Sequence, residues 1–225
     1  MEINNILLIL LFAAIGLTIY AQIKVRSTFR KYSKIRGSFG LTGSQVARYI
    51  LDKNGLYNVR IEHVHGELSD HYDPRAKVVR LSDSVYGSTS LAAVAVAAHE
   101  VGHAIQDAND YSFLRFRHAL VPLVNFTSRF TWILILAGLF FNMTGMLDLG
   151  IIFFSLAVLF QVITLPVEFN ASKRALSELR TYELVAENEI VGSKKVLSAA
   201  ALTYVAAMIY SVIELLHLIA MRNNN

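Results

Sequence analysis

Four long apolar stretches constrain this 225-residue chain more than any other feature of its sequence. They cover residues 6–23, 131–147, 149–167 and 196–221, and each carries at most one charged residue. A helix rises about 1.5 Å per residue and needs about 20 residues to cross the roughly 30 Å of hydrocarbon in a bilayer. The stretches therefore predict four transmembrane helices, the second and third joined as a hairpin by a short polar break at Asp148.

Basic residues gather at one end of these stretches, which predicts the orientation of the chain. Fourteen of the 21 Lys and Arg residues lie between positions 22 and 118 and five between 168 and 195, whereas the hairpin tip has none. Because cytoplasmic loops are enriched in Lys and Arg, we expect both regions in the cytosol and both chain ends outside. No basic residue precedes the first stretch and no clear cleavage site follows it, which argues against a secretory signal.

The composition excludes several classes of protein. Hydrophobic residues make up 54% of the chain, against about 45–50% in soluble domains, and only 17% are charged, so intrinsic disorder is excluded. The chain has no Cys, so a metal ion must be held by His, Asp or Glu. The net charge of +4 is explained by the basic cytosolic regions, and no nucleic-acid partner is predicted.

The region after the first stretch has the pattern of a small α+β domain. Start and stop residues and the spacing of apolar side chains predict a helix over 42–54, strands over 57–64 and 77–81, and a helix from 91 to about 106. Residues 71–74 are predicted as a turn or an irregular strand end, because Pro74 restricts the residue before it. The strand over 77–81 is either an ordinary strand of the sheet or a candidate to pair with an extended substrate.

The sequence His99-Glu100-Val101-Gly102-His103 in the last of these helices is an HExxH motif. Histidines four residues apart lie on one helix face, so both imidazoles can reach one metal ion, and Glu100 can hold a water molecule beside it. The helical context that the motif requires is also predicted here. The motif therefore predicts a catalytic metal site.

A catalytic zinc site needs three protein ligands and one open position. No His follows at the HExxHxxGxxH spacing, so the third ligand is a carboxylate or a distant His on the same side of the membrane. Two transmembrane stretches separate His103 from Glu168, which therefore returns to the cytosolic face; its alternative is a solvated interfacial carboxylate. The poorer candidates are Asp107, Glu183, Glu187 and Glu189.

Four further segments carry a resemblance to a known family: Leu68–Arg75, Val79–Ser82, Ala95–Gln106 and Ala199–Ala206. Through them the chain resembles the YugP-type zinc-dependent membrane peptidases of bacteria, a family similar to the gluzincins and to HtpX-type membrane proteases. The resemblance spans nearly the whole chain. It implies Zn²⁺ as cofactor, His99, His103 and Glu168 as zinc ligands, Glu100 as catalytic base, and a bacterial plasma membrane as location.

The residues and the resemblance together predict a mainly α membrane protein, with four transmembrane helices and a small α+β zincin-like cytosolic catalytic domain. Its predicted parts are an N-terminal transmembrane anchor (1–23), a cytosolic metallopeptidase domain (24–118), a transmembrane hairpin (119–167), a cytosolic helix with the third ligand (168–195) and a C-terminal transmembrane helix (196–225). The expected partners are a peptide or protein substrate, the lipid bilayer, and an oligomer or complex partner.

Two positions depart from the pattern of this family. Many gluzincins have Asp four residues after the ligand Glu, where this chain has Ser172, and Asn170 stands where an acidic residue is expected. Changes among such outer partners lower metal affinity or activity by about 10–100-fold. The sequence therefore leaves the support of the two imidazoles unassigned.

The predicted reaction is hydrolysis of peptide bonds in membrane-associated or misfolded proteins at the cytosolic face. The group that stabilises the oxyanion stays open among His71, Tyr72, Arg174 and Tyr182.

Three alternative functions also stay open. An intramembrane protease requires an HExxH motif inside a span, but only eight apolar residues precede His99. A non-catalytic metal-binding adaptor or regulatory subunit is favoured by Asn170 and Ser172. A transporter rests on Glu214 and His217 in the last stretch, because ionisable groups inside a membrane are functional candidates. The pair lies near the outer end of that stretch, where the side chains can reach the interface, and this second interpretation is preferred.

Overall fold

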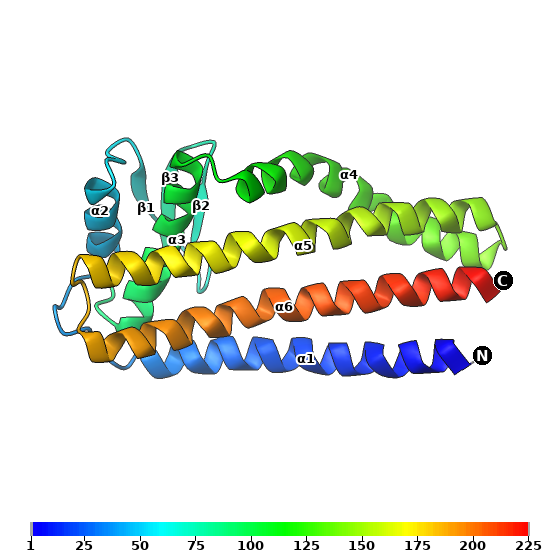
Figure 1. Cartoon of the computed structure of the whole chain (residues 1–225), viewed down its shortest axis with the longest axis horizontal. Coiled ribbons are helices and arrows are strands. Elements are labelled where there is room, and N and C mark those ends of the chain that lie inside the picture. Colours follow the sequence, from blue (N-terminus) through cyan, green and yellow to red (C-terminus); the bar gives the residue numbers. More distant parts are fainter. Residues whose placement is uncertain (1, 225) are drawn as a thin grey trace. The chain divides into compact units, whose positions relative to one another are not determined.

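The computed structural model describes residues 2–224, which form six helices and three strands (Figure 1). In chain order they are α1 (Glu2–Tyr32), α2 (Gly43–Lys53), β1 (Arg60–Val64), β2 (His71–Asp73), β3 (Val78–Ser82), α3 (Leu91–Ala108), α4 (Ser112–Phe140), α5 (Thr144–Thr181) and α6 (Glu187–Asn224). The chain divides into two compact units. A helical unit contains α1 up to Gln22, Arg115–Pro166, and α6 from Thr203; a mixed unit contains Ile23–Leu114 and Val167–Leu202.

Four helices of the described chain are long and apolar enough to cross a membrane, namely α1, α4, α5 and α6. The prediction of a mainly helical chain with four such helices and a small sheet is confirmed. The helices are longer than the apolar stretches alone, and α5 and α6 have 38 residues each.

The turn between α4 and α5 was predicted at Asp148, and this prediction was wrong. Asp148 lies inside α5, where its carboxylate accepts a hydrogen bond from the Arg222 guanidinium (Nε to Oδ1, 2.7 Å). The turn comes earlier, where Asn142 has a φ of 53° and the Met143 N–H donates to Gly138 O at 2.9 Å. This is the backbone pattern of a Schellman helix end. A local backbone motif, rather than a charged residue, therefore ends α4.

Residues 168–195 were predicted as one cytosolic helix, and the structure divides them between two. α5 runs past the apolar stretch, and α6 begins after a loop in which Glu183 has a φ of 52°. The continuation of α5 is explained by Ala171, Ala175 and Leu179, which recur every four residues and are fully buried.

The sheet of the mixed unit has the strand order β1-β3-β2. β1 pairs with β3 in parallel and β2 pairs with it antiparallel, with Tyr72 opposite Val79. Residues 71–73, predicted as a turn or an irregular strand end, therefore form a short edge strand, and Pro74 follows the end of this strand. The strand over 77–81 is an ordinary sheet strand, one of its two predicted roles; as the central strand it is not available to pair with a substrate.

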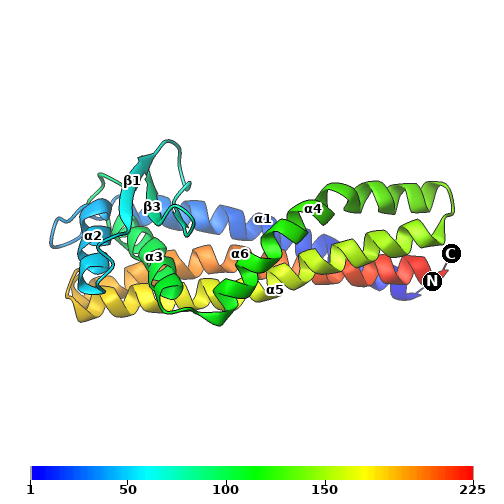
Figure 2. The ribbon, with the colours of Figure 1, turned by 90° about the horizontal axis from the view of Figure 1, so that it is seen from above.

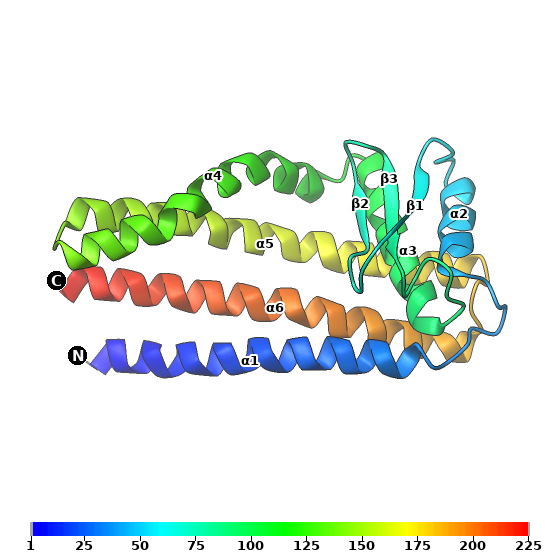
Figure 3. The same ribbon diagram turned by 180° about the vertical axis from the view of Figure 1, so that it is seen from behind.

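The helices α2 and α3 pack against each other and against this sheet (Figures 2 and 3). Both begin where the sequence predicts. Thr42 caps α2, since its hydroxyl accepts from the Gln45 N–H and its own N–H donates to the Gln45 side chain. Ser90 caps α3 by accepting from the Ala93 N–H at 3.2 Å. These caps and a continuous apolar core hold α3 in place.

Candidate metal centre

The HExxH motif lies in the middle of α3, and its two histidines face the same side. The ring centroids of His99 and His103 are 4.8 Å apart, and the rings are nearly perpendicular. Both side chains are largely shielded from solvent, with 14% and 10% of their surface exposed. One turn of helix therefore places two imidazoles together, as the spacing predicts.

Glu168 of α5 completes a group of three candidate metal ligands. Its Oε2 lies 3.2 Å from His99 Nε2 and 3.6 Å from His103 Nε2, and the residue is 2% exposed. Zinc bond lengths of about 2.0–2.2 Å put neighbouring ligand atoms about 3.3 Å apart in a tetrahedral site. Two imidazole nitrogens and a carboxylate oxygen at these distances fit a zinc ion.

Gly102 explains how α5 comes close enough to α3. A Cβ atom at Gly102 would lie 2.6 Å from the carbonyl oxygen of Ala171 and 3.2 Å from its Cα. The backbones of the two helices therefore meet at this point. Ala171 lies between Glu168 and Ser172, so the close approach carries both side chains to the histidines.

Gln106 was missed in the sequence, and the structure makes it the partner of His103. Its Oε1 lies 3.0 Å from His103 Nδ1, while its amide nitrogen donates to Val167 O at 2.8 Å and to Asn170 Oδ1 at 3.0 Å. The two acceptors fix the amide orientation, so Oε1 faces the imidazole and Nδ1 carries the proton. The lone pair of His103 is then on Nε2, which faces Glu168. The spacing of Gln106 three residues after His103 could have indicated this contact.

The two departures from the family pattern have structural roles. Ser172 Oγ lies 3.2 Å from His99 Nδ1, and its hydroxyl oxygen can accept the imidazole N–H. Asn170 Oδ1 accepts from Gln106 and from Arg174 Nε at 2.8 Å. A hydroxyl and an amide therefore stand where carboxylates were expected, and they orient the imidazoles without adding negative charge.

Glu100 is buried beside the ligand group. It is 8% exposed, and burial raises its pKa to about 7, with His99 opposing and Glu168 adding to the rise. Its carboxylate also accepts a hydrogen bond from the backbone of Tyr72 in β2. A carboxyl group with a pKa near neutrality can accept a proton and give it back.

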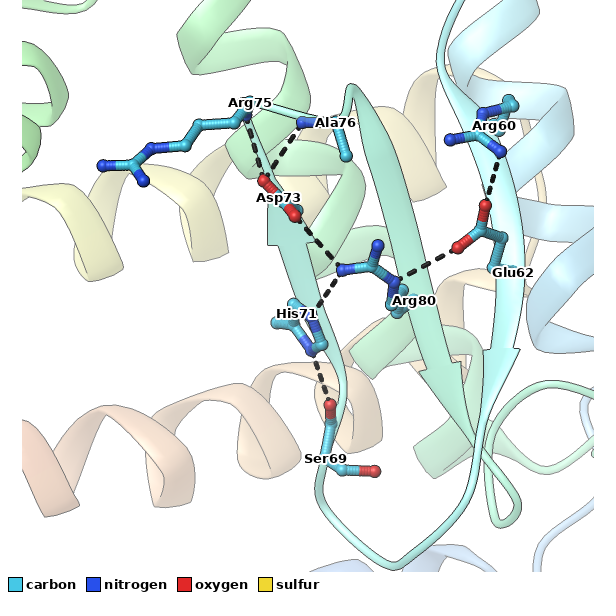
Figure 4. A network of polar contacts seen from close by, with 8 residues as sticks. All are labelled: Arg60, Glu62, Ser69, His71, Asp73, Arg75, Ala76 and Arg80. Atoms are coloured by element: carbon cyan, nitrogen blue, oxygen red, sulfur yellow. Dashed lines mark hydrogen bonds and ion pairs between the residues drawn. The ribbon is translucent and has the colours of Figure 1, made fainter.

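The candidates for oxyanion stabilisation have other contacts. His71 lies in a network centred on Arg80, with Nδ1 2.8 Å from Ser69 O and Nε2 3.3 Å from Arg80 Nη1 (Figure 4). Arg80 joins the strands of the sheet through Asp73 and Glu62. His71 thus belongs to a network across the sheet.

The other three candidates also contact protein groups. The Tyr72 hydroxyl donates to Asp107 Oδ2 at 2.6 Å, and burial together with this bond raises the pKa of Tyr72. Arg174 supports Asn170, and Tyr182 packs edge-on against Tyr49. These contacts leave the assignment of the oxyanion donor open.

The poorer candidates for the third ligand are engaged away from the histidines. Asp107 also accepts from Lys77, Glu187 from Arg180, and Glu189 from Ser38. Glu183 lies exposed in the loop before α6.

Comparisons with known proteins identify similar proteins. The family described as "Putative neutral zinc metallopeptidase" matches residues 7–223. The chain is 52% identical over 210 residues to "Putative membrane protease YugP" of Bacillus subtilis (strain 168), covering 93% of each chain. No solved structure matches. The family description names zinc, which the donor set of the site also suits.

Proposed function

Because the chain belongs to this zinc metallopeptidase family, we propose that it is a membrane-anchored endopeptidase with zinc held by His99, His103 and Glu168. One observation carries the proposal. Three side chains from helices far apart in sequence direct their ligand atoms to one point, all within 4.8 Å of one another. The gluzincin arrangement, HExxH plus a later Glu, is part of this proposal.

The chain's own residues supply positioning and proton transfer. Zinc, when bound, makes water more acidic and polarises a carbonyl group. Glu100 would accept a proton from the attacking water and pass it to the leaving amine, because its buried carboxylate lies beside the ligand group and burial raises its pKa. Gln106 and Ser172 keep the Nε2 atoms of the two imidazoles directed at the ligand group.

The site faces the cytosol in this proposal, and its substrates are membrane-associated or misfolded proteins. The excess of Lys and Arg in 22–118 and 168–195 supports the orientation. Glu168 directly follows the apolar stretch 149–167 in sequence, which supports a site near the membrane surface. Tails and loops that leave the bilayer would reach such a site first.

Two rival functions are less well supported. The adaptor hypothesis was favoured by Asn170 and Ser172, but both contribute to the orientation of the ligand histidines. The intramembrane protease requires a spanning α3, and α3 is not among the four candidate spans of residues 3–223.

The decisive experiment replaces Glu100 with Gln in the full-length protein in detergent. We expect cleavage of labelled casein to disappear while the tightly held zinc remains, since Glu100 is not a ligand. Glu183→Gln is the control and should cleave like the wild type. Retained cleavage by Glu100→Gln would reject the assigned base, and a wild type that holds zinc but cleaves no unfolded protein would favour the adaptor.

A further inference from the structure

A second group of potential metal ligands lies at the end of the sheet. His63 is in β1, His65 follows β1 directly, and Asp83 follows β3. Residues two apart on a strand point to the same side. β1 and β3 run in parallel with His63 opposite Leu81 and Val64 opposite Ser82. The same register brings His65 alongside Asp83.

The three side chains converge on one carboxylate oxygen. Asp83 Oδ1 lies 2.6 Å from His63 Nε2 and 3.5 Å from His65 Nδ1. One ligand atom from each residue lies within 4.8 Å of the others, as in the HExxH group. An ordinary His–Asp pair contains one imidazole. Here the side chain of His65, although 94% exposed, is a second imidazole directed at the same carboxylate oxygen.

Neighbouring groups hold these ligands in place. Asp83 Oδ2 accepts from the Gly66 N–H at 2.9 Å, which leaves Oδ1 directed at the imidazoles and lowers the pKa of Asp83. Gly66 has a φ of 114°, a backbone conformation that favours glycine. The His63 ring packs edge-on against Tyr86 with centroids 5.4 Å apart. The carboxylate and one imidazole therefore already lie together. Their 2.6 Å contact is a hydrogen bond, so the two atoms move apart toward the roughly 3.3 Å spacing of zinc ligands when a metal ion replaces the shared proton.

We propose that His63, His65 and Asp83 form a second metal site, selective for Zn²⁺ and similar divalent transition metals. Two imidazoles and one carboxylate suit these metals better than Mg²⁺ or Ca²⁺, which prefer oxygen ligands. Solvent completes the coordination, because the three side chains are 39%, 94% and 51% exposed. The site therefore binds more weakly than the buried one.

A metal ion here joins the start of the β1–β2 loop to the end of β3. The same loop carries Asp70, whose carboxylate accepts from the Ser82 N–H and hydroxyl at 2.7 and 2.9 Å. It then enters β2, where the backbone of Tyr72 contacts Glu100. The structural role of the second metal is to rigidify the loop that leads to this strand.

Zinc titration of the full-length protein in detergent tests the proposal. At saturation with Zn²⁺ alone, elemental analysis should find two ions per wild-type chain and one in His65→Ala or Asp83→Ala. Glu67→Ala, a change in the same loop, is the control and should keep two. Excess Mg²⁺ or Ca²⁺ should not displace the second ion.

Two further measurements separate this site from the HExxH site. Glu168→Ala should still bind one zinc at saturation, and adding His65→Ala should remove it. Hydrogen exchange of residues 65–70 should slow when Zn²⁺ saturates the wild type but not His65→Ala. A single zinc per wild-type chain that Glu168→Ala removes, or equal zinc in wild type and His65→Ala, would overturn the second site without affecting the proposed peptidase.

Discussion

The mixed unit contains two clusters with the same ligand types, two His and one carboxylate, in opposite environments. In the HExxH cluster the carboxylate of Glu168 is 3% exposed, and both imidazoles have a hydrogen-bond partner on Nδ1. In the sheet-end cluster of His63, His65 and Asp83 the carboxylate is 51% exposed. Ligand type alone therefore does not distinguish the two sites.

The difference lies in what surrounds the ligands. The HExxH cluster is built where two helix backbones meet, and burial shields its charges from water, which strengthens their attraction to a cation. The sheet-end cluster is built on a strand end and a turn, where water competes for the same ligands. The first arrangement suits a tightly held catalytic ion and the second an exchangeable one.

Removing Glu168 should have the largest effect on the difference in zinc affinity between the two clusters. Glu168→Ala takes away one of three ligands at the HExxH cluster. Zinc affinity should therefore fall by more than about 100-fold, which is the most that losing a hydrogen-bond partner of a ligand usually costs. Cleavage should be lost with it. Zinc content after dialysis against metal-free buffer measures the effect, with Glu183→Ala as control. Equal, tight zinc in wild type and Glu168→Ala would exclude Glu168 as a ligand.

Closing the space at Gly102 should be the next largest change. Gly102→Ala places a methyl group 2.6 Å from Ala171 O, and overpacking of this kind lowers the free energy of unfolding by about 1–3 kcal/mol. Helix propensity alone would make Gly102→Ala more stable by about 1 kcal/mol. A loss of stability would therefore show that the close packing of the two helices outweighs helix propensity. The midpoint temperature of thermal unfolding and the rate of casein cleavage should both decrease. Gly16→Ala, with no neighbouring atom within 4 Å, is the matched control and should not destabilise; a Gly102→Ala variant as stable and active as wild type would refute the close approach.

Loss of the Gln106 amide should weaken zinc binding without removing a ligand. Gln106→Leu keeps the size of the side chain but frees His103 Nδ1, so zinc affinity should fall by about 10–100-fold. Competition with a chelator of known affinity measures this. Gln106→Glu keeps an acceptor for Nδ1 and should retain more affinity, and exposed Asn109→Ala should change nothing. Unchanged affinity in Gln106→Leu would contradict the role of the amide.

Ser172→Ala should have the smallest effect. It removes one partly buried hydrogen bond to His99, a change of about 0.5–1.5 kcal/mol or about 2- to 10-fold in zinc affinity. The same chelator competition measures it, and Ser172→Thr, which keeps the hydroxyl, should restore binding. A loss as large as that in Gln106→Leu would show that the two imidazoles depend equally on their partners.

Much of the fold was predictable because its determinants are local. The Thr42 and Ser90 caps and the HExxH spacing each act within one or two helical turns, and each apolar stretch is one continuous segment of the sequence. The turn before α5 was misplaced because a local backbone motif at Asn142, and not the charge of Asp148, ends α4. Longer contacts decided between the two interpretations of residues 71–73, which form a strand because β3 pairs with them.

The sequence by itself determined the four apolar helices, the helix that carries HExxH, and the pair of imidazoles on one of its faces, because hydrophobic length and helical period are properties of neighbouring residues. Only the tertiary structure decided that Glu168 and Ser172 reach those imidazoles, that the Gln106 amide is fixed by Val167 and Asn170, and that His65 meets Asp83. Glu168 and Ser172 lie 69 and 73 residues from His99 in the sequence. The geometry of these contacts depends on how closely α3 and α5 pack. Gly102 and Ala171 together set this distance, and neither residue by itself indicates it in the sequence.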